Sequence, residues 1–298
     1  MIWIYVIIAI IVGIVSGIIF YIFIKNKVLA SVLTIITIAI ALIITNLALP
    51  HYFTWQVEYA LRKQNPFMNL VAEKSPNEFN AYVKKIKHNL LTHGNPNNDV
   101  IYTSELINDL LIKYGPVASN ESIYQYLQSD IDFEKKLLAI NPVLVLFHVF
   151  PDKFKDKVDL QKYNINEIKN NMLSSVEAVI KSGMEHPEPL PTAEEIAKAK
   201  VLFSGIIAEL AKKYGPEKLT EALKHPDDPS IDKKTVAEIV IDLSEATLAK
   251  GKDDVGLILK AAFLAHQQKQ QNAQLYLTPL QNNIETAWIA SYVSIVSL

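Results

Sequence analysis

The first fifty residues hold two long apolar runs that are separated by the polar segment Lys25-Asn26-Lys27. The runs cover residues 2–24 and 28–49, and neither contains a charged residue. Because a helix rises about 1.5 Å per residue, each run is long enough to cross a hydrocarbon core of about 30 Å. The first run is too long for the core of a cleaved secretory signal, and no basic segment precedes it. We therefore predict a two-helix transmembrane hairpin over residues 1–50 that remains on the chain.

The charges beside the spans predict the orientation of the hairpin. Lys25 and Lys27 lie in the connecting loop, and loops that are rich in Lys and Arg usually stay in the cytoplasm. The part that follows Pro50 is then expected on the outer side, which is the periplasm if the membrane is a bacterial inner membrane. Arg62 and Lys63 lie close enough to the second span to favour the opposite orientation, so a cytoplasmic domain is the alternative.

Aromatic residues are expected where each span meets the membrane surface, because their amphipathic rings prefer the headgroup region. The predicted anchors are Trp3, Tyr5, Tyr52, Phe53 and Trp55. They indicate depth in the membrane and do not distinguish the two orientations.

Small residues recur every four positions in the first span, at Ala9, Gly13 and Gly17. Such spacing places them on one helical face and lets a second helix approach closely. We predict that this face packs against the second span; contact with another copy or another membrane subunit is the alternative. The spans contain no ionisable residue, which argues against a pump or transporter.

The part after the hairpin is predicted to be all-α, a bundle or an array of helical hairpins. Capping signals such as Thr192 with Glu195 predict helix starts, and Gly183, Gly215 and Gly251 predict helix ends. Between Pro142 and Pro151, the apolar run 143–150 is interpreted as a buried helix, with a strand as the alternative. The predicted helices cover residues 52–63, 76–92, 104–114, 120–129, 166–182, 193–214, 216–224, 232–250, 254–274 and 279–296.

Three prolines, at positions 187, 189 and 191, predict an extended connector over residues 184–191. It would separate a first helical subdomain, residues 51–183, from a second, residues 192–298.

Composition limits the possible partners and sites. The chain has 29 Lys and Arg against 31 Asp and Glu, with the signs interleaved, so nucleic acid is a poor partner. The absence of cysteine excludes disulfides and thiolate metal sites. We therefore expect the lipid bilayer and other membrane or envelope proteins as partners, and a second copy of the chain is a further candidate.

The sequence shows no motif of a known catalytic, cofactor or metal site. None of the seven histidines has metal-ligand spacing, and nucleophile and phosphate-binding motifs are missing. We predict no enzyme, no cofactor and no metal. Two loops, 186–188 and 225–228, combine His with acidic residues and would share an ion only if they met. A hidden site is also conceivable if His148 faces carboxylates from distant helices.

Three segments carry a resemblance to a group of proteins. They are Pro50 after the second span, 113–126 with its break at Gly115-Pro116, and the run from Asn141-Pro142 to Phe150-Pro151. In these segments the chain resembles a loose group of membrane-anchored helical proteins of proteobacteria. The resemblance implies the architecture and no activity.

The leading hypothesis is a membrane-anchored helical interaction or scaffold protein, a structural or accessory subunit of a bacterial envelope complex. The hairpin, the helices and the missing catalytic motifs all agree with it. A membrane-inserting effector or toxin-like protein is the alternative, followed by an enzyme whose site is invisible in the sequence.

Overall fold

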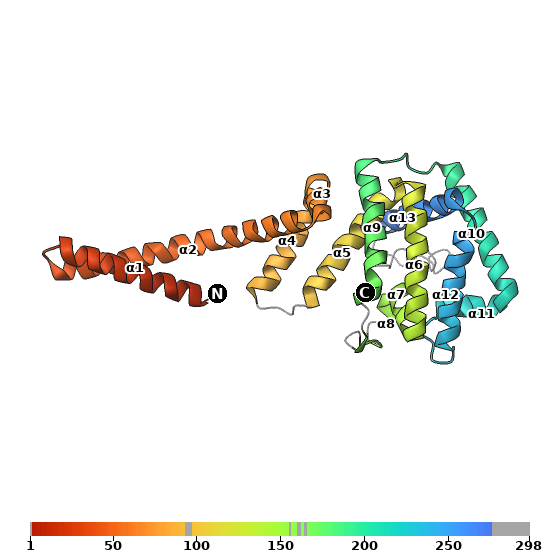
Figure 1. The fold of residues 1–298 in the computed structure, drawn as a ribbon, viewed down its shortest axis with the longest axis horizontal. Helices are drawn as coiled ribbons and strands as arrows, with labels where there is room; N and C mark the ends of the chain where they lie inside the picture. The colour runs from red at the N-terminus through yellow and green to blue at the C-terminus, as the bar shows by residue number, and fades with distance from the viewer. Residues whose placement is uncertain (1, 93–96, 155, 160–161, 164–165, 276–298) are drawn as a thin grey trace. The chain divides into compact units, whose positions relative to one another are not determined.

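The computed structural model describes residues 2–92, 97–154, 156–159, 162–163 and 166–275, and the described part is helical without strands (Figure 1). This confirms the predicted all-α class. The chain forms two compact units, Met1–Asp99 and Val100–Leu298. The predicted helix at 279–296 lies outside the described residues.

The first unit begins with a helical hairpin of α1 (Ile2–Phe23) and α2 (Lys27–Gln64), which pack against each other. The side chain of Asn26 caps α2 by accepting hydrogen bonds from the backbone N–H groups of Val28 and Leu29. Helix α2 continues through Pro50, so the predicted second span and the predicted helix at 52–63 are one helix. Proline is tolerated inside transmembrane helices where neighbouring groups satisfy the backbone carbonyl that loses its hydrogen bond.

The hairpin has two kinds of surface: a narrow seam where α1 and α2 pack together, and an apolar exterior. The seam on α2 consists of Ala30, Leu33, Thr34, Thr37, Ile38 and Ala41, which recur at steps of three and four. Large exposed side chains cover the rest, among them Ile7, Ile10, Ile14, Ile18, Ile35, Ile36, Ile40 and Ile43. Both helices are long and apolar enough to cross a membrane, and only 6% of each apolar segment is buried within the chain. A core helix of a water-soluble protein would instead be mostly buried.

Two shorter helices complete the first unit: α3 (Pro66–Lys74) and α4 (Pro76–Leu91). Asn65 caps α3, and both helices carry proline at the first position, where its missing N–H costs nothing. The two helices pack on each other and on α2 around buried apolar side chains, among them Val71 and Phe79.

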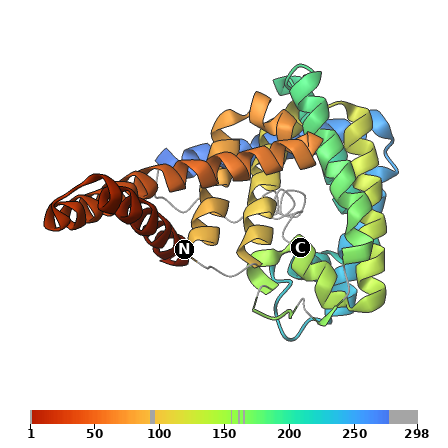
Figure 2. The ribbon, with the colours of Figure 1, turned by 60° about the vertical axis from the view of Figure 1, so that its left-hand side comes forward.

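The second unit is built around α6 (Asn120–Ile140), which packs against α7, α9, α12 and α13 (Figures 1 and 2). The other helices, in chain order, are α5 (Asn97–Tyr114), the 3-10 turn η1 (Gly115–Val117), α7 (Pro142–Val149), α8 (Pro151–Phe154), α9 (Asn166–Glu185), α10 (Ala193–Tyr214), α11 (Pro216–Lys224), α12 (Lys233–Leu248) and α13 (Lys252–Leu275). Helix α7 confirms the predicted buried helix, because its side chains from Leu144 to Val149 are all buried.

Two of the three predicted glycine stops are confirmed. Gly215 and Gly251 both have φ of 86°, a backbone conformation that glycine adopts without strain. The stop at Gly183 is wrong, because α9 continues to Glu185. A Cβ at Gly183 would overlap the backbone carbonyl of Tyr114, so this glycine permits a close helix contact.

The proline-rich segment 184–191 lies inside the second unit. The backbone N–H of Glu188 donates to the carbonyl of Val117 at 2.8 Å. Helices from both sides of this segment pack on α6, so residues 100–183 and 192–275 share one core.

Candidate functional site

The predicted small-residue face of α1 lies half-buried along the hairpin. A Cβ placed on Gly13 would lie 3.1 Å from Ile38 Cδ1, and one on Gly17 would lie 3.9 Å from Thr34 Cγ2. Both glycines therefore face the seam of α2. Ala9 lies on the same face and is also half-buried.

The predicted topology residues lie at the turn of the hairpin, and both are exposed. The Lys27 ammonium donates to the backbone carbonyl of Tyr21 at 2.8 Å and lies 3.6 Å from the centroid of the Tyr21 ring. Lys27 and Tyr21 therefore contact each other at the turn of the hairpin, a combination that suits a membrane surface.

Aromatic rings form a row on α2 beyond the apolar segment. The centroids of Tyr52 and Trp55 lie 6.1 Å apart, and those of Trp55 and Tyr59 lie 5.6 Å apart. Tyr59 extends the predicted set. The side chains of Trp3, Tyr5 and Phe53 lie outside the described ones.

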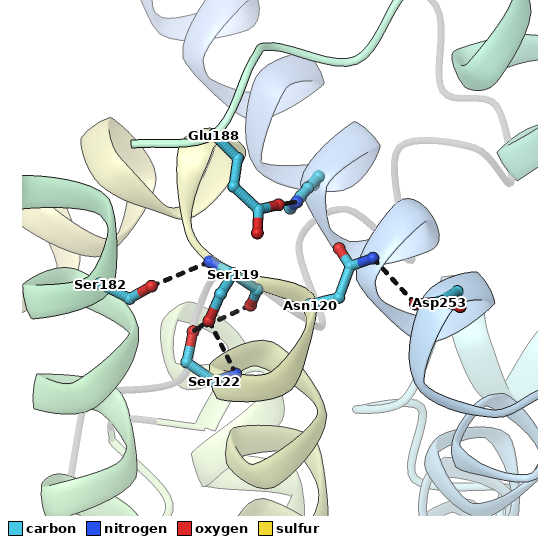
Figure 3. A network of polar contacts seen from close by, with 7 residues as sticks. Ser119, Asn120, Ser122, Ser182, Glu188 and Asp253 are labelled. Atoms are coloured by element: carbon cyan, nitrogen blue, oxygen red, sulfur yellow. Dashed lines mark hydrogen bonds and ion pairs between the residues drawn. The ribbon is translucent and has the colours of Figure 1, made fainter. Parts of the chain in front are cut away.

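In the two histidine-containing loops, 186–188 and 225–228, acidic residues pair with lysines of the same chain. Glu188 lies 2.5 Å from the Lys260 ammonium, in a network that also joins Ser119 to Ser182 and Asn120 to Asp253 (Figure 3). Asp227, in the other loop, pairs with Lys153 and Lys157. Glu188 and Asp227 therefore have separate lysine partners.

A groove of about 490 Å³ lies beside the proline-rich segment. Residues 188–192 line one side, and Lys198 and Leu257 contribute from α10 and α13. Leu190 is 54% exposed there, although it is a large apolar side chain. The groove thus combines an accessible apolar contact with surrounding charges.

A second polar feature lies in the interior of the second unit. Asp130 and Glu134 are four residues apart on α6, so they share one helical face. This face points into the core, and the two residues are only 3% and 2% exposed. Buried carboxylates are rare because leaving water is costly for a charge.

Helix α7 adds a histidine to these carboxylates. Asn141 caps α7 by accepting from the backbone N–H of Val143, and Pro142 occupies the first position. The short helix packs on α6 and buries His148 completely. His148 Nε2 lies 2.9 Å from Asp130 Oδ1, and the Phe133 ring contacts the imidazole edge-on at 5.1 Å between centroids.

Burial dominates the electrostatics of the cluster. It raises the pKa of Glu134 well above the ordinary value of 4.5, and the nearby Asp130 charge raises this pKa further. The hydroxyl of Ser244 on α12 opposes the shift by hydrogen bonding to Glu134. A cavity of about 10 Å³ adjoins Asp130, Glu134 and Ser244, which is room for about one water molecule.

The raised pKa of Glu134 predicts a pH dependence of stability. The folded chain holds this proton more tightly than the unfolded chain, so its stabilising contribution is complete below pH 4.5 and is lost as pH rises through the folded-state pKa. We expect the free energy of unfolding of wild type, measured in EDTA, to fall relative to that of Glu134→Gln as pH rises from 4.5 to the folded-state pKa of Glu134. The expected fall is up to about 1.4 kcal/mol per pH unit. Chemical unfolding at stepped pH measures the difference; parallel curves for the two proteins would contradict the prediction.

Sequence reasoning considered His148 beside distant carboxylates but did not identify Asp130 and Glu134. The available signal was two acidic residues at i and i+4 on a face that also carries Ile123, Leu127 and Leu137. Acidic residues that continue an apolar stripe point to a buried polar site.

Comparisons with protein-family models, with curated proteins and with solved structures find no match to this chain.

Proposed function

We propose that the chain is a two-pass membrane protein whose second unit serves as an interaction or scaffold subunit of a bacterial envelope complex. The observation that carries the proposal is the exposed apolar exterior of α1 and α2. If no partner protein covers this surface, a lipid bilayer must. A contiguous surface of this kind greatly exceeds the apolar patches of water-soluble monomers.

The exposed lysines of the hairpin turn support an outward second unit. Lys25 and Lys27 favour a cytoplasmic turn, so the second unit would face the periplasm of an inner membrane. Partners are then periplasmic or membrane-embedded envelope proteins, or a second copy of the chain.

The groove beside residues 188–192 is the surface at which we propose that a partner binds. Leu190 offers an apolar anchor, and Lys198 and Asp253 offer charges of both signs around it. An apolar centre with a polar rim is the usual anatomy of a protein interface.

Complex formation after mild solubilisation tests this proposal. We expect native detergent extracts to show the chain in an assembly larger than its own 33.5 kDa plus detergent. Leu190→Glu should dissociate the assembly by placing a charge at the apolar centre. Val201→Glu is the matched control, because Val201 is 72% exposed on α10 and does not line the groove. Light scattering coupled to size exclusion measures the mass; a monomer without partners in wild type would refute the proposal.

A further inference from the structure

The buried cluster of Asp130, Glu134 and His148 lies outside the membrane anchor and the groove, so the proposed function leaves it unexplained. Among the described residues, these three form the one group of His, Asp or Glu whose possible ligand atoms all lie within 4.8 Å of one another. An imidazole nitrogen with two carboxylate oxygens is a donor set that suits Zn²⁺, Mn²⁺ or Fe²⁺.

The distances fit one small cation after slight adjustment. Neighbouring ligands that lie about 2.1 Å from a single ion are about 3.0 to 3.4 Å apart. His148 Nε2 and Asp130 Oδ1 are already 2.9 Å apart. Glu134 lies one turn further along α6, and the adjoining cavity of about 10 Å³ leaves space for one water-sized species.

One carboxylate oxygen of the cluster lacks a partner, which is the independent sign of a missing ligand. Glu134 Oε2 is buried and makes no hydrogen bond to any described residue. Buried polar atoms are almost always satisfied, and the exceptions often mark a water or an ion. Glu134 also lines the cavity, so its carboxylate is next to the available space.

Charge balance is compatible with a divalent cation at this cluster. No lysine or arginine among the described residues pairs with Asp130 or Glu134, and His148 is the partner of Asp130. Metal binding requires both carboxylates in their ionised forms, and these then need two compensating positive charges in an interior from which water is excluded. A divalent ion supplies both charges, whereas a water molecule supplies none.

We propose that Asp130, Glu134 and His148 bind one divalent transition-metal cation, with the Ser244 hydroxyl beside the remaining coordination position. The ligands come from α6 and α7, so the ion ties these two helices together next to Ser244 of α12. The three ligands are completely buried, which leaves a substrate no access from solvent and favours a structural role.

Metal stoichiometry of the full-length chain tests the proposal. The protein, purified in detergent without a histidine tag, is stripped with EDTA, dialysed and equilibrated with Zn²⁺ or Mn²⁺. We expect one tightly held ion per chain by elemental analysis and a rise in Tm of about 5 °C or more at a hundredfold excess over Kd. Absence of a bound ion and of a Tm shift with both metals would overturn the proposal.

Matched variants assign the ion to this cluster. Glu134→Gln and His148→Gln should weaken binding beyond the roughly 10- to 100-fold that changes around the ligands typically cost. Glu238→Gln is the control, because Glu238 is a half-exposed glutamate on α12 outside the cluster. Wild-type affinity in both cluster variants would place the ion elsewhere and overturn the proposal.

A spectroscopic measurement on wild type keeps the proposal testable if the variants fail to fold. X-ray absorption of the Zn²⁺-loaded chain should show one imidazole and otherwise oxygen ligands. Two or more imidazoles would contradict a site that contains only His148.

Discussion

Placing one aspartate in the middle of each span, as Ile14→Asp with Ile36→Asp, should release the chain from the membrane. Both isoleucines lie on the apolar exterior, so the substitutions leave the helix seam intact. An aspartate near the centre of a transmembrane helix costs about 2.5 to 3.5 kcal/mol, and the pair costs on the order of 5 to 7 kcal/mol. The fraction of the chain that stays in the membrane pellet after an alkaline wash measures the effect.

The matched control for this experiment is Val201→Asp. Val201 is an exposed apolar residue of the second unit, so its substitution adds a charge without touching the spans. This variant should remain in the pellet like wild type. If the doubly substituted chain also remains there, the apolar exterior does not hold the chain in the membrane.

The second large effect is expected at Gly183, inside α9. Alanine normally stabilises a helix interior by about 1 kcal/mol relative to glycine. At Gly183, however, a Cβ would overlap the backbone carbonyl of Tyr114, which cannot rotate away as a side chain would. We therefore expect Gly183→Ala to destabilise the second unit by about 1 to 3 kcal/mol.

Gly205 provides the comparison, because it is exposed on α10 and a Cβ there would meet nothing within 4 Å. Gly205→Ala should be neutral or stabilising. Unfolding followed by circular dichroism compares the two variants with wild type. Equal stabilities for the two variants would show that α9 and Tyr114 are not in tight contact.

The sequence predicts much of the architecture because its signals are local. Uninterrupted apolar runs define the hairpin, and the capping box of Thr192 with Glu195 fixes the start of α10 as observed. Helix α3 was not predicted, because nine residues carry too little periodicity for a confident assignment.

The buried cluster was missed for the same reason that α6 was predicted too short. The apolar pattern of α6 is interrupted at Asp130 and Glu134, and this interruption suggests solvent exposure and a helix end near residue 129. Helix α6 instead runs to Ile140 and buries both carboxylates against His148. Their spacing along the apolar stripe is a local signal of burial, but which side chains cover them depends on tertiary packing with α7 and with α12, which lies about a hundred residues further along the chain.

Two similar segments show how tertiary contacts decide backbone conformation. Tyr114-Gly115-Pro116 and Tyr214-Gly215-Pro216 have the same residues, yet Gly215 has a positive φ and Gly115 begins a 3-10 turn. A Cβ at Gly115 would lie 2.5 Å from Phe263 Cδ2, whereas one at Gly215 would meet nothing. Contact with α13 therefore accompanies the different conformation at Gly115.

The orientation of the hairpin determines which partners the second unit can meet. If flanking charge sets it, replacing Lys25 and Lys27 by neutral residues and adding two lysines after Met1 should weaken or invert the preference. An unchanged topology would show that the large second unit, and not the turn, sets the orientation.

The most direct test of a two-pass protein with an outward second unit is a pair of C-terminal reporter fusions. Alkaline phosphatase is active only outside the inner membrane, and green fluorescent protein exported through the general secretion route fluoresces only inside. We expect phosphatase activity without fluorescence, because two spans and a basic cytoplasmic turn place the C-terminal side in the periplasm. Bright fluorescence with inactive phosphatase would contradict this orientation and move the proposed partners to the cytoplasm.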